Sequence, residues 1–227
     1  MSKTKPASKI EAICPFPDVA LPLLWQWIEE ARTQVADDFA PQTPTEFIAL
    51  ERARVADGSI INFAIYRDFE LGGYVKVVPT GPITCDAHCI FKRDFYGTQT
   101  TLPALNDVAR QLFEAGIERI TLSTLAQNAA IRALLRKLGA VEEGRLREAT
   151  RQNSLPVDVV VFGLLKHEWE ARQNAEVRTR NDESPTGPVP HSAFIVPTSE
   201  LNPAPKLESD AWQAKQSASE APLSVVS

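Results

Sequence analysis

The sequence has few cysteines, no long hydrophobic run and no excess of positive charge. Its apolar stretches fall short of the ~18 residues that a transmembrane helix needs, and the N-terminus has no run typical of a signal peptide. The formal net charge of -5 at pH 7 gives no electrostatic reason to bind nucleic acid or an acidic membrane. We therefore expect a soluble, cytoplasmic protein whose partners include neither nucleic acid nor a membrane.

The three cysteines are too sparse to form a disulfide framework. Cys85 and Cys89 fall in one expected strand, which places them about 13 Å apart along one face. That separation is too long for a disulfide, and paired zinc ligands usually lie closer together, on a turn. We expect buried free thiols in a reducing compartment, and no metal site.

Composition changes sharply after about residue 170. A chain of 227 residues that is 44% hydrophobic can bury one good core. Residues 171–227, however, are rich in Pro, Ser, Asn, Glu and Ala and have only scattered apolar residues, which predicts a mostly disordered tail. Two apolar islands around Phe194 and Trp212 could bind a protein partner, or could be chance residues of such a tail. The domain is therefore predicted to span residues 1–170.

The first half of this domain predicts an edge strand, two helices and three strands. The edge strand is expected within residues 8–16, an amphipathic helix over 17–39, and a second helix over 43–58 that is capped by Thr45 and ended by Gly58. Runs rich in Ile, Val, Tyr and Phe then predict an antiparallel meander over residues 59–68, 71–80 and 83–94, separated by the turn-like stretches FELGG and TGP.

The second half alternates helices and strands. A helix is expected after residue 95, a strand over 118–125, a helix over 128–140 closed by Gly139, and long strands over 141–152 and 155–169, the last with a charged end. The strands that flank the first of these helices should be parallel through a crossover, and their neighbours antiparallel. The prediction is an α+β fold, with a mixed, mostly antiparallel sheet and helices on both faces.

Residues 125–169 carry a longer pattern, LAQNAAIRALLRKLGAVEEGRLREATRQNSLPVDVVVFGLLKHEW. Together with the order of elements, it resembles the GNAT superfamily of N-acetyltransferases, most closely the branch of ribosomal-protein and N-terminal acetyltransferases. The matching positions are Asn128, Lys137, Gly139, Glu143, Gly144, Arg147, Asp158, Leu164, Leu165, Glu168 and Trp169. A looser resemblance, based on a strand histidine, a weakened loop and a long polar tail, is to acetyltransferase-like proteins of tailed bacteriophages.

The resemblance implies a GNAT fold with acetyl-CoA as co-substrate and a primary amine, on a peptide or a small molecule, as acceptor. Acetyl-CoA would lie where the fourth and fifth strands separate, its pantetheine along the backbone of Ile90, Phe91 and Lys92. The amine would attack the thioester directly in a ternary complex. Such a reaction needs a donor to the developing oxyanion, a base for the ammonium and an acid for the thiolate.

The loop expected to hold the pyrophosphate departs from the family pattern. The family has Gln or Arg, two residues, Gly, one residue and then Gly or Ala before a helix N-terminus. Here those three positions are Tyr96, Gln99 and Thr101. The loop residues implied to contact the cofactor are Gly97, Thr98, Gln99, Thr100 and Thr101, whose hydroxyls could bind phosphate or only cap the helix. Changing Gln99 to glycine is expected to tighten acetyl-CoA binding.

The sequence offers fewer candidates for catalytic side chains than for cofactor-binding residues. Strand alternation places Asp86 and His88 on one face with Lys92, and histidine titrates near neutral pH, so His88 and Asp86 are the candidates for the base, although a lone strand histidine is more often structural. Asn128 is implied to face the cofactor, or it is an ordinary helix cap. Leu135 stands where many members of the family have a tyrosine that protonates the thiolate.

Two functions remain open on the sequence alone. One is N-acetyl transfer from acetyl-CoA to an amine. The alternative is a weak or inactive acetyltransferase-like fold that serves as a binding module, or as a structural or assembly module of a bacteriophage virion, with the tail as its contact arm.

Overall fold

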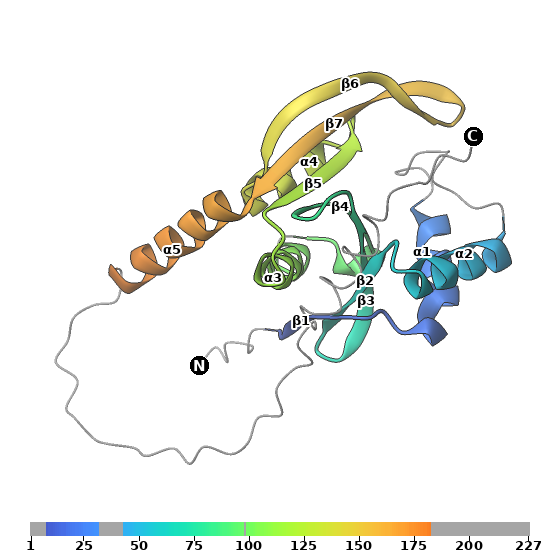
Figure 1. The fold of residues 1–227 in the computed structure, drawn as a ribbon, viewed down its shortest axis with the longest axis horizontal. Helices are drawn as coiled ribbons and strands as arrows, with labels where there is room; N and C mark the ends of the chain where they lie inside the picture. Colours follow the sequence, from blue (N-terminus) through green and yellow to red (C-terminus); the bar gives the residue numbers. More distant parts are fainter. Residues whose placement is uncertain (1–7, 32–42, 98, 183–227) are drawn as a thin grey trace, which may run out of the picture. The chain divides into compact units, whose positions relative to one another are not determined.

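The computed structural model describes residues 8–31, 43–97 and 99–182 (Figure 1). The chain divides into two compact units, Met1–Lys166 and His167–Ser227. The first unit holds a seven-stranded sheet with the order β1-β2-β3-β4-β5-β7-β6. Its strands are β1 (Ile10–Ile13), β2 (Ile61–Arg67), β3 (Glu70–Pro79), β4 (Thr84–Phe91), β5 (Arg119–Leu125), β6 (Val141–Gln152) and β7 (Leu155–Leu165).

All neighbouring strands of this sheet are antiparallel except β4 and β5, which are parallel and joined by a crossover. The helices of the unit are α1 (Leu21–Glu30), α2 (Pro44–Ala56), α3 (Thr101–Glu114) and α4 (Ala129–Leu138), with short 3-10 turns η1 (Asp18–Ala20) and η4 (Arg93–Phe95). Figure 1 shows α1 and α2 on one side of β2–β4 and α3 on the other. The predicted α+β fold, with its mixed, mostly antiparallel sheet, is confirmed.

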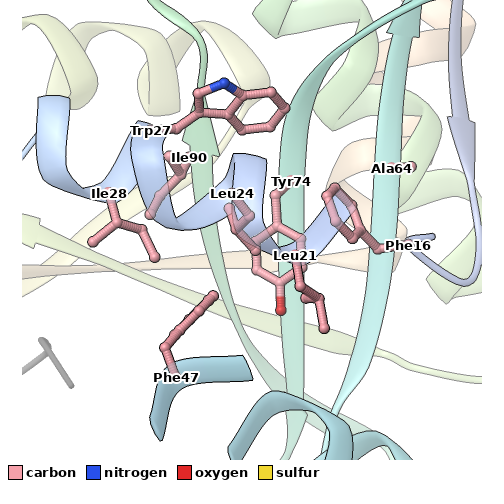
Figure 2. Packing of buried hydrophobic residues seen from close by; sticks show 9 residues of the cluster. All are labelled: Phe16, Leu21, Leu24, Trp27, Ile28, Phe47, Ala64, Tyr74 and Ile90. Atoms are coloured by element: carbon pink, nitrogen blue, oxygen red, sulfur yellow. The ribbon is translucent and has the colours of Figure 1, made fainter. Parts of the chain in front are cut away.

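A hydrophobic cluster fixes α1 and α2 to the sheet (Figure 2). Helical spacing puts Leu21, Leu24 and Ile28 on one face of α1, where they are buried together with Phe47 of α2. The sheet contributes three residues that pair across neighbouring strands and so form a row, Ala64 of β2, Tyr74 of β3 and Ile90 of β4. Burial of this set holds the two helices over the face of β2–β4 that ends at the site described below.

The turn between β2 and β3 differs from the prediction. We expected FELGG to be a turn, but the hairpin turns at Asp68 and Phe69, with φ of 51° and 71°, and β3 begins at Glu70. Gly72 lies inside the strand. A glycine is needed at this position because the ring of Phe95 occupies the place where a Cβ would project. The glycine pair therefore permits a close approach of ring and backbone and does not mark a turn.

Helix ends follow ordinary capping chemistry, with one correction. The hydroxyl of Thr43, not that of Thr45, caps α2 by accepting the backbone N–H of Glu46 at 3.2 Å, and Pro44 occupies the first helical position. The sequence TPT offers two candidate caps, and the preference of proline for the first turn decides between them. Gly139 closes α4 with φ of 101°, as predicted.

The end of the domain also differs from the prediction. We expected a strand to residue 169, but β7 ends at Leu165 and the chain continues as α5 (Lys166–Asp182). This segment contains several Glu, Arg and Ala residues, which favour helix, but it has no apolar face. Its polar composition is the reason for the prediction of disorder from residue 171. The rest of the predicted tail, with Phe194 and Trp212, lies outside the described residues. Among the helices that the structure describes, none has both the length and the apolar character needed to cross a membrane.

Candidate functional site

The two parallel strands separate halfway along their length. β4 and β5 pair only through residues 84–87 and 119–122, while β4 continues to Phe91 and β5 to Leu125. On their outer edges the pairing of β4 with β3 and of β5 with β7 continues beyond this point. The inner edges of residues 88–91 and 123–125 therefore border a gap in the middle of the sheet, which is the feature that the resemblance implied.

A cavity of about 340 Å³ occupies this gap, a size that falls within the range of ligand sites. β4 lines it with residues 87–91 and β5 with residues 122–125, and α4 closes one side with Asn128, Ile131 and Leu135. Tyr74 of β3 and Tyr96, which follows β4, add two phenol rings. The wall is mainly apolar, with His88 as its basic group among the described residues. Such a wall suits an extended organic chain that carries a reactive group.

His88 lies in the cavity wall, as its predicted role requires. Burial lowers the pKa of its imidazole below the ordinary value of 6.5, the positive charge of Lys76 lowers this pKa further, and the negative charge of Asp86 raises it. Because the net shift is downward, His88 is neutral at pH 7. A neutral imidazole can accept a proton.

Asp86 and Lys92 do not line the cavity, in contrast to His88. Asp86 precedes the point where β4 and β5 part, because it still pairs across from Thr121. The ammonium of Lys92 lies 2.6 Å from Glu70 and 3.5 Å from Asp94, at the surface. Alternation predicts one face for these residues, but the point where the pairing of β4 with β5 ends decides which of them reach the gap. Of the predicted strand residues, His88, Ile90 and Phe91 line the cavity.

The loop before α3 is built on Gly97, whose φ of 134° is rarely adopted by other residues. The carbonyl of Gly97 accepts the backbone N–H groups of Thr100 and Thr101, at 3.2 and 2.9 Å. The side chain of Thr101 is buried and donates its hydroxyl to the carbonyl of Phe95 at 3.0 Å, and Thr100 makes no side-chain cap. The Thr101 hydroxyl therefore donates its proton within the fold, and that proton is not available to the predicted phosphate.

Gln99 in the same loop is exposed, and Thr98 lies outside the described residues. Neither position settles the predicted role of the loop in pyrophosphate binding. That role stays a prediction that depends on the backbone of the first turn of α3.

Asn128 is confirmed as a helix cap, and its predicted contact with the cofactor stays a prediction. Its Oδ1 accepts the backbone N–H of Ile131 at 3.2 Å and so caps α4, and the residue also lines the cavity. Leu135, about two turns further along α4, lines the same cavity. At the place where the family resemblance implies an acid, the wall is therefore aliphatic.

Glu143 and Asp158, two residues of the family-like pattern, brace the β6–β7 hairpin. Glu143 forms a two-point ion pair with Arg119 of β5, 2.9 Å for the longer contact, and this pair lowers the pKa of the Glu143 carboxyl. Asp158 accepts the backbone N–H of Glu148 at 2.8 Å, at an irregularity of β6, and pairs with Arg145 at 2.7 Å. Glu143 thus ties β6 to β5 across β7, and Asp158 ties β7 to β6.

A buried polar group beside the cavity was missed at the sequence level. The carboxylate of Glu51, on α2 and only 2% exposed, accepts the hydroxyl of Tyr74 at 2.5 Å and lies 3.3 Å from the ammonium of Lys76. In Figure 2 the Tyr74 hydroxyl points away from Trp27, toward α2. The signal available was Lys76 itself, since a lysine inside the apolar run GYVKVV needs a partner for its charge.

Comparison with known proteins supports the fold. No family model matches the sequence. Among solved structures, a spermidine/spermine N-acetyltransferase from Vibrio cholerae is 17% identical with a TM-score of 0.63, and the match covers 74% of this chain and 98% of that one. The ribosomal-protein α-N-acetyltransferase RimL, in complex with coenzyme A, is 17% identical with a TM-score of 0.60, over 70% and 96% of the two chains.

A further match is a putative acetyltransferase at 22% identity, with a TM-score of 0.61 and coverage of 79% of this chain and 99% of that one. At these identities the likeness shows a shared fold. The chain therefore has the acetyltransferase fold that the sequence predicted.

Proposed function

We propose that this protein is an N-acetyltransferase that transfers an acetyl group from acetyl-CoA directly to a primary amine. The observation that carries the proposal is the gap between β4 and β5, which holds a mainly apolar cavity with a neutral histidine in its wall. The backbone of β4 beyond residue 87 would bind the pantetheine, and the N-terminal turn of α3 the pyrophosphate. The RimL structure, which has this fold, contains coenzyme A.

His88 would serve both proton transfers of the reaction. As the amine nitrogen attacks the thioester carbonyl, a C–N bond forms, and the imidazole accepts the proton that the nitrogen loses. When the tetrahedral intermediate collapses, the C–S bond breaks and the imidazolium can pass this proton to the departing thiolate. The phenol of Tyr96 is a poorer acid for this step because burial raises its pKa. If His88 carries the proton from the amine to the thiolate, the reaction needs no separate acid at the position of Leu135, where the side chain is aliphatic.

The acceptor is a primary amine whose carrier the fold alone does not specify. Acceptors of proteins with this fold include spermidine or spermine and the ribosomal protein acetylated by RimL. The test is therefore a comparison of amine classes: spermidine, a peptide with a free α-amine, and a peptide whose only amine is a lysine side chain.

The experiment follows release of the CoA thiol by the full-length chain, with the same peptides acetylated beforehand as matched controls. We expect release that depends on one class of free amine, and a product acetylated at that amine by mass spectrometry. Absence of amine-dependent release with every class would contradict the proposal. It would instead favour the alternative of a binding or assembly module.

A further inference from the structure

Three polar residues form a row across the sheet and end at the cavity. Asn62 of β2 pairs with Lys76 of β3, and Lys76 pairs with His88 of β4. Directly opposed residues of antiparallel strands project from the same face, with their Cβ atoms about 4.5–5.5 Å apart. This is the face that α1 and α2 cover, because the adjacent row of Ala64, Tyr74 and Ile90 belongs to their hydrophobic cluster. The row therefore runs beneath α2 to the wall of the site.

The middle of this row is charged although it is buried. Lys76 is 8% exposed and Glu51 is 2% exposed, and their charged atoms lie 3.3 Å apart. A buried ion pair seldom adds stability compared with apolar residues of the same size, because both charges lose their hydration. The pair is also well anchored, since Glu51 accepts the Tyr74 hydroxyl and Asn62 accepts the backbone N–H of Phe16 at 3.0 Å. A role other than stability would explain why ionic groups occupy this place.

His88 is the cavity residue that such a charge would influence. Lys76 of β3 lies directly opposite His88, and Tyr74 lies two residues away on the same strand. Glu51 of α2 affects His88 only through its ion pair with Lys76. On β4 itself Asp86 lies two residues away on the same face and Cys89 is its neighbour. Beyond the gap, β5 presents Ser123 and Thr124, and α1 ends near the cavity at Ala31. Among the described residues, the charges around His88 are thus the buried ammonium of Lys76, which pairs with Glu51, and the carboxylate of Asp86 on the same strand as His88.

We propose that Lys76, held in place by Glu51, is a positioning residue that keeps His88 neutral and so able to accept the amine proton, and that Asp86 opposes it. This inference rests on the proposed function. The ammonium of Lys76 makes a second positive charge at His88 costly, whereas the Asp86 carboxylate favours it. Burial of the imidazole is the largest cause that lowers the His88 pKa, and these two charges act on the same pKa with opposite signs.

The test is a pair of substitutions whose effects must have opposite signs. Lys76→Met keeps most of the side-chain volume and removes the cation, so the His88 pKa should rise and the acidic limb of the kcat profile should move to higher pH. Asp86→Asn removes the opposing charge, so the limb should move to lower pH. Lys9→Met, an exposed lysine that pairs with Glu11, is the matched control and should leave the limb in place.

Two further measurements keep the test decisive. If Lys76→Met unfolds the chain because Glu51 loses its partner, the double variant Lys76→Met with Glu51→Gln removes both charges and should give the same upward shift. The His88 pKa is also measured directly by NMR titration of the imidazole signals, assigned by replacing each of the three histidines in turn. This readout does not require turnover.

The outcomes separate the inference from the function. A wild-type chain without amine-dependent CoA release would overturn the proposed function, while the NMR titration would still report on Lys76. A chain with activity in which both substitutions leave the limb unmoved, or move it in the same direction, would overturn the inference alone.

Discussion

Replacing His88 with glutamine is expected to lower kcat for acetyl transfer by about 10²–10⁴-fold, the range typical for loss of a general base. Glutamine is polar and similar in size, so the cavity should keep its shape, but an amide cannot take the amine proton. Because the proposed role of His88 is at the reacting nitrogen and not at the nucleotide, acetyl-CoA should bind His88→Gln about as tightly as the wild type. CoA release with the accepted amine, measured beside acetyl-CoA binding, checks both expectations.

The matched control for this variant is His167→Gln. His167 lies in α5, in the other unit of the chain, and does not line the cavity. Its replacement should leave kcat unchanged. If His88→Gln instead keeps near wild-type turnover, His88 is not the base, and the amine proton leaves by another route.

Replacing Glu51 with alanine is expected to destabilise the fold by about 3–5 kcal/mol, the usual cost of removing one partner of a buried ion pair. The loss leaves the Lys76 ammonium buried without this carboxylate, and it removes the acceptor of the Tyr74 hydroxyl. The cost is therefore the penalty for groups left unsatisfied, and it exceeds the net value of the interaction. Urea unfolding of the wild type and Glu51→Ala measures it.

A neighbouring ion pair on the same helix provides the control. Arg52 pairs with Asp18 at 2.7 Å, but both side chains are more than half exposed, so Arg52→Ala should leave the unfolding midpoint almost unchanged. The double variant Glu51→Ala with Lys76→Met should be less destabilised than the sum of its single variants, because removing both charges leaves none unpaired. Equal effects of Glu51→Ala and Arg52→Ala would show that the Glu51 pair contributes no more than a surface contact.

Much of the fold could be predicted because its signals are local. Alternation and β-branched residues marked β2, β4 and β5, and Gly139 marked the end of α4. The errors came where a residue type has two meanings. Gly72 permits a close contact and does not mark a turn, and the polar run after Leu165 forms a helix without an apolar face.

The candidate site was predictable in part. Strand periodicity and the family resemblance found His88, Ile90, Phe91 and Asn128, which all line the cavity. Periodicity could not tell that Asp86 lies before the gap, because that depends on where pairing between two distant segments ends. Nor could it find Glu51, since the apolar residues of α2 do not gather on one face and only its packing on β3 buries this carboxylate.

Calorimetric titration with acetyl-CoA tests the central claim, that the gap between β4 and β5 is the cofactor site. Ser123 is exposed on the β5 side of this gap, so a phenylalanine at that position should fill the cavity without disturbing the core. We expect the wild type to bind one acetyl-CoA per chain, and Ser123→Phe to bind none while it keeps the wild-type melting temperature. A wild type that gives no binding heat, or a Ser123→Phe variant that binds with unchanged affinity, would contradict the claim.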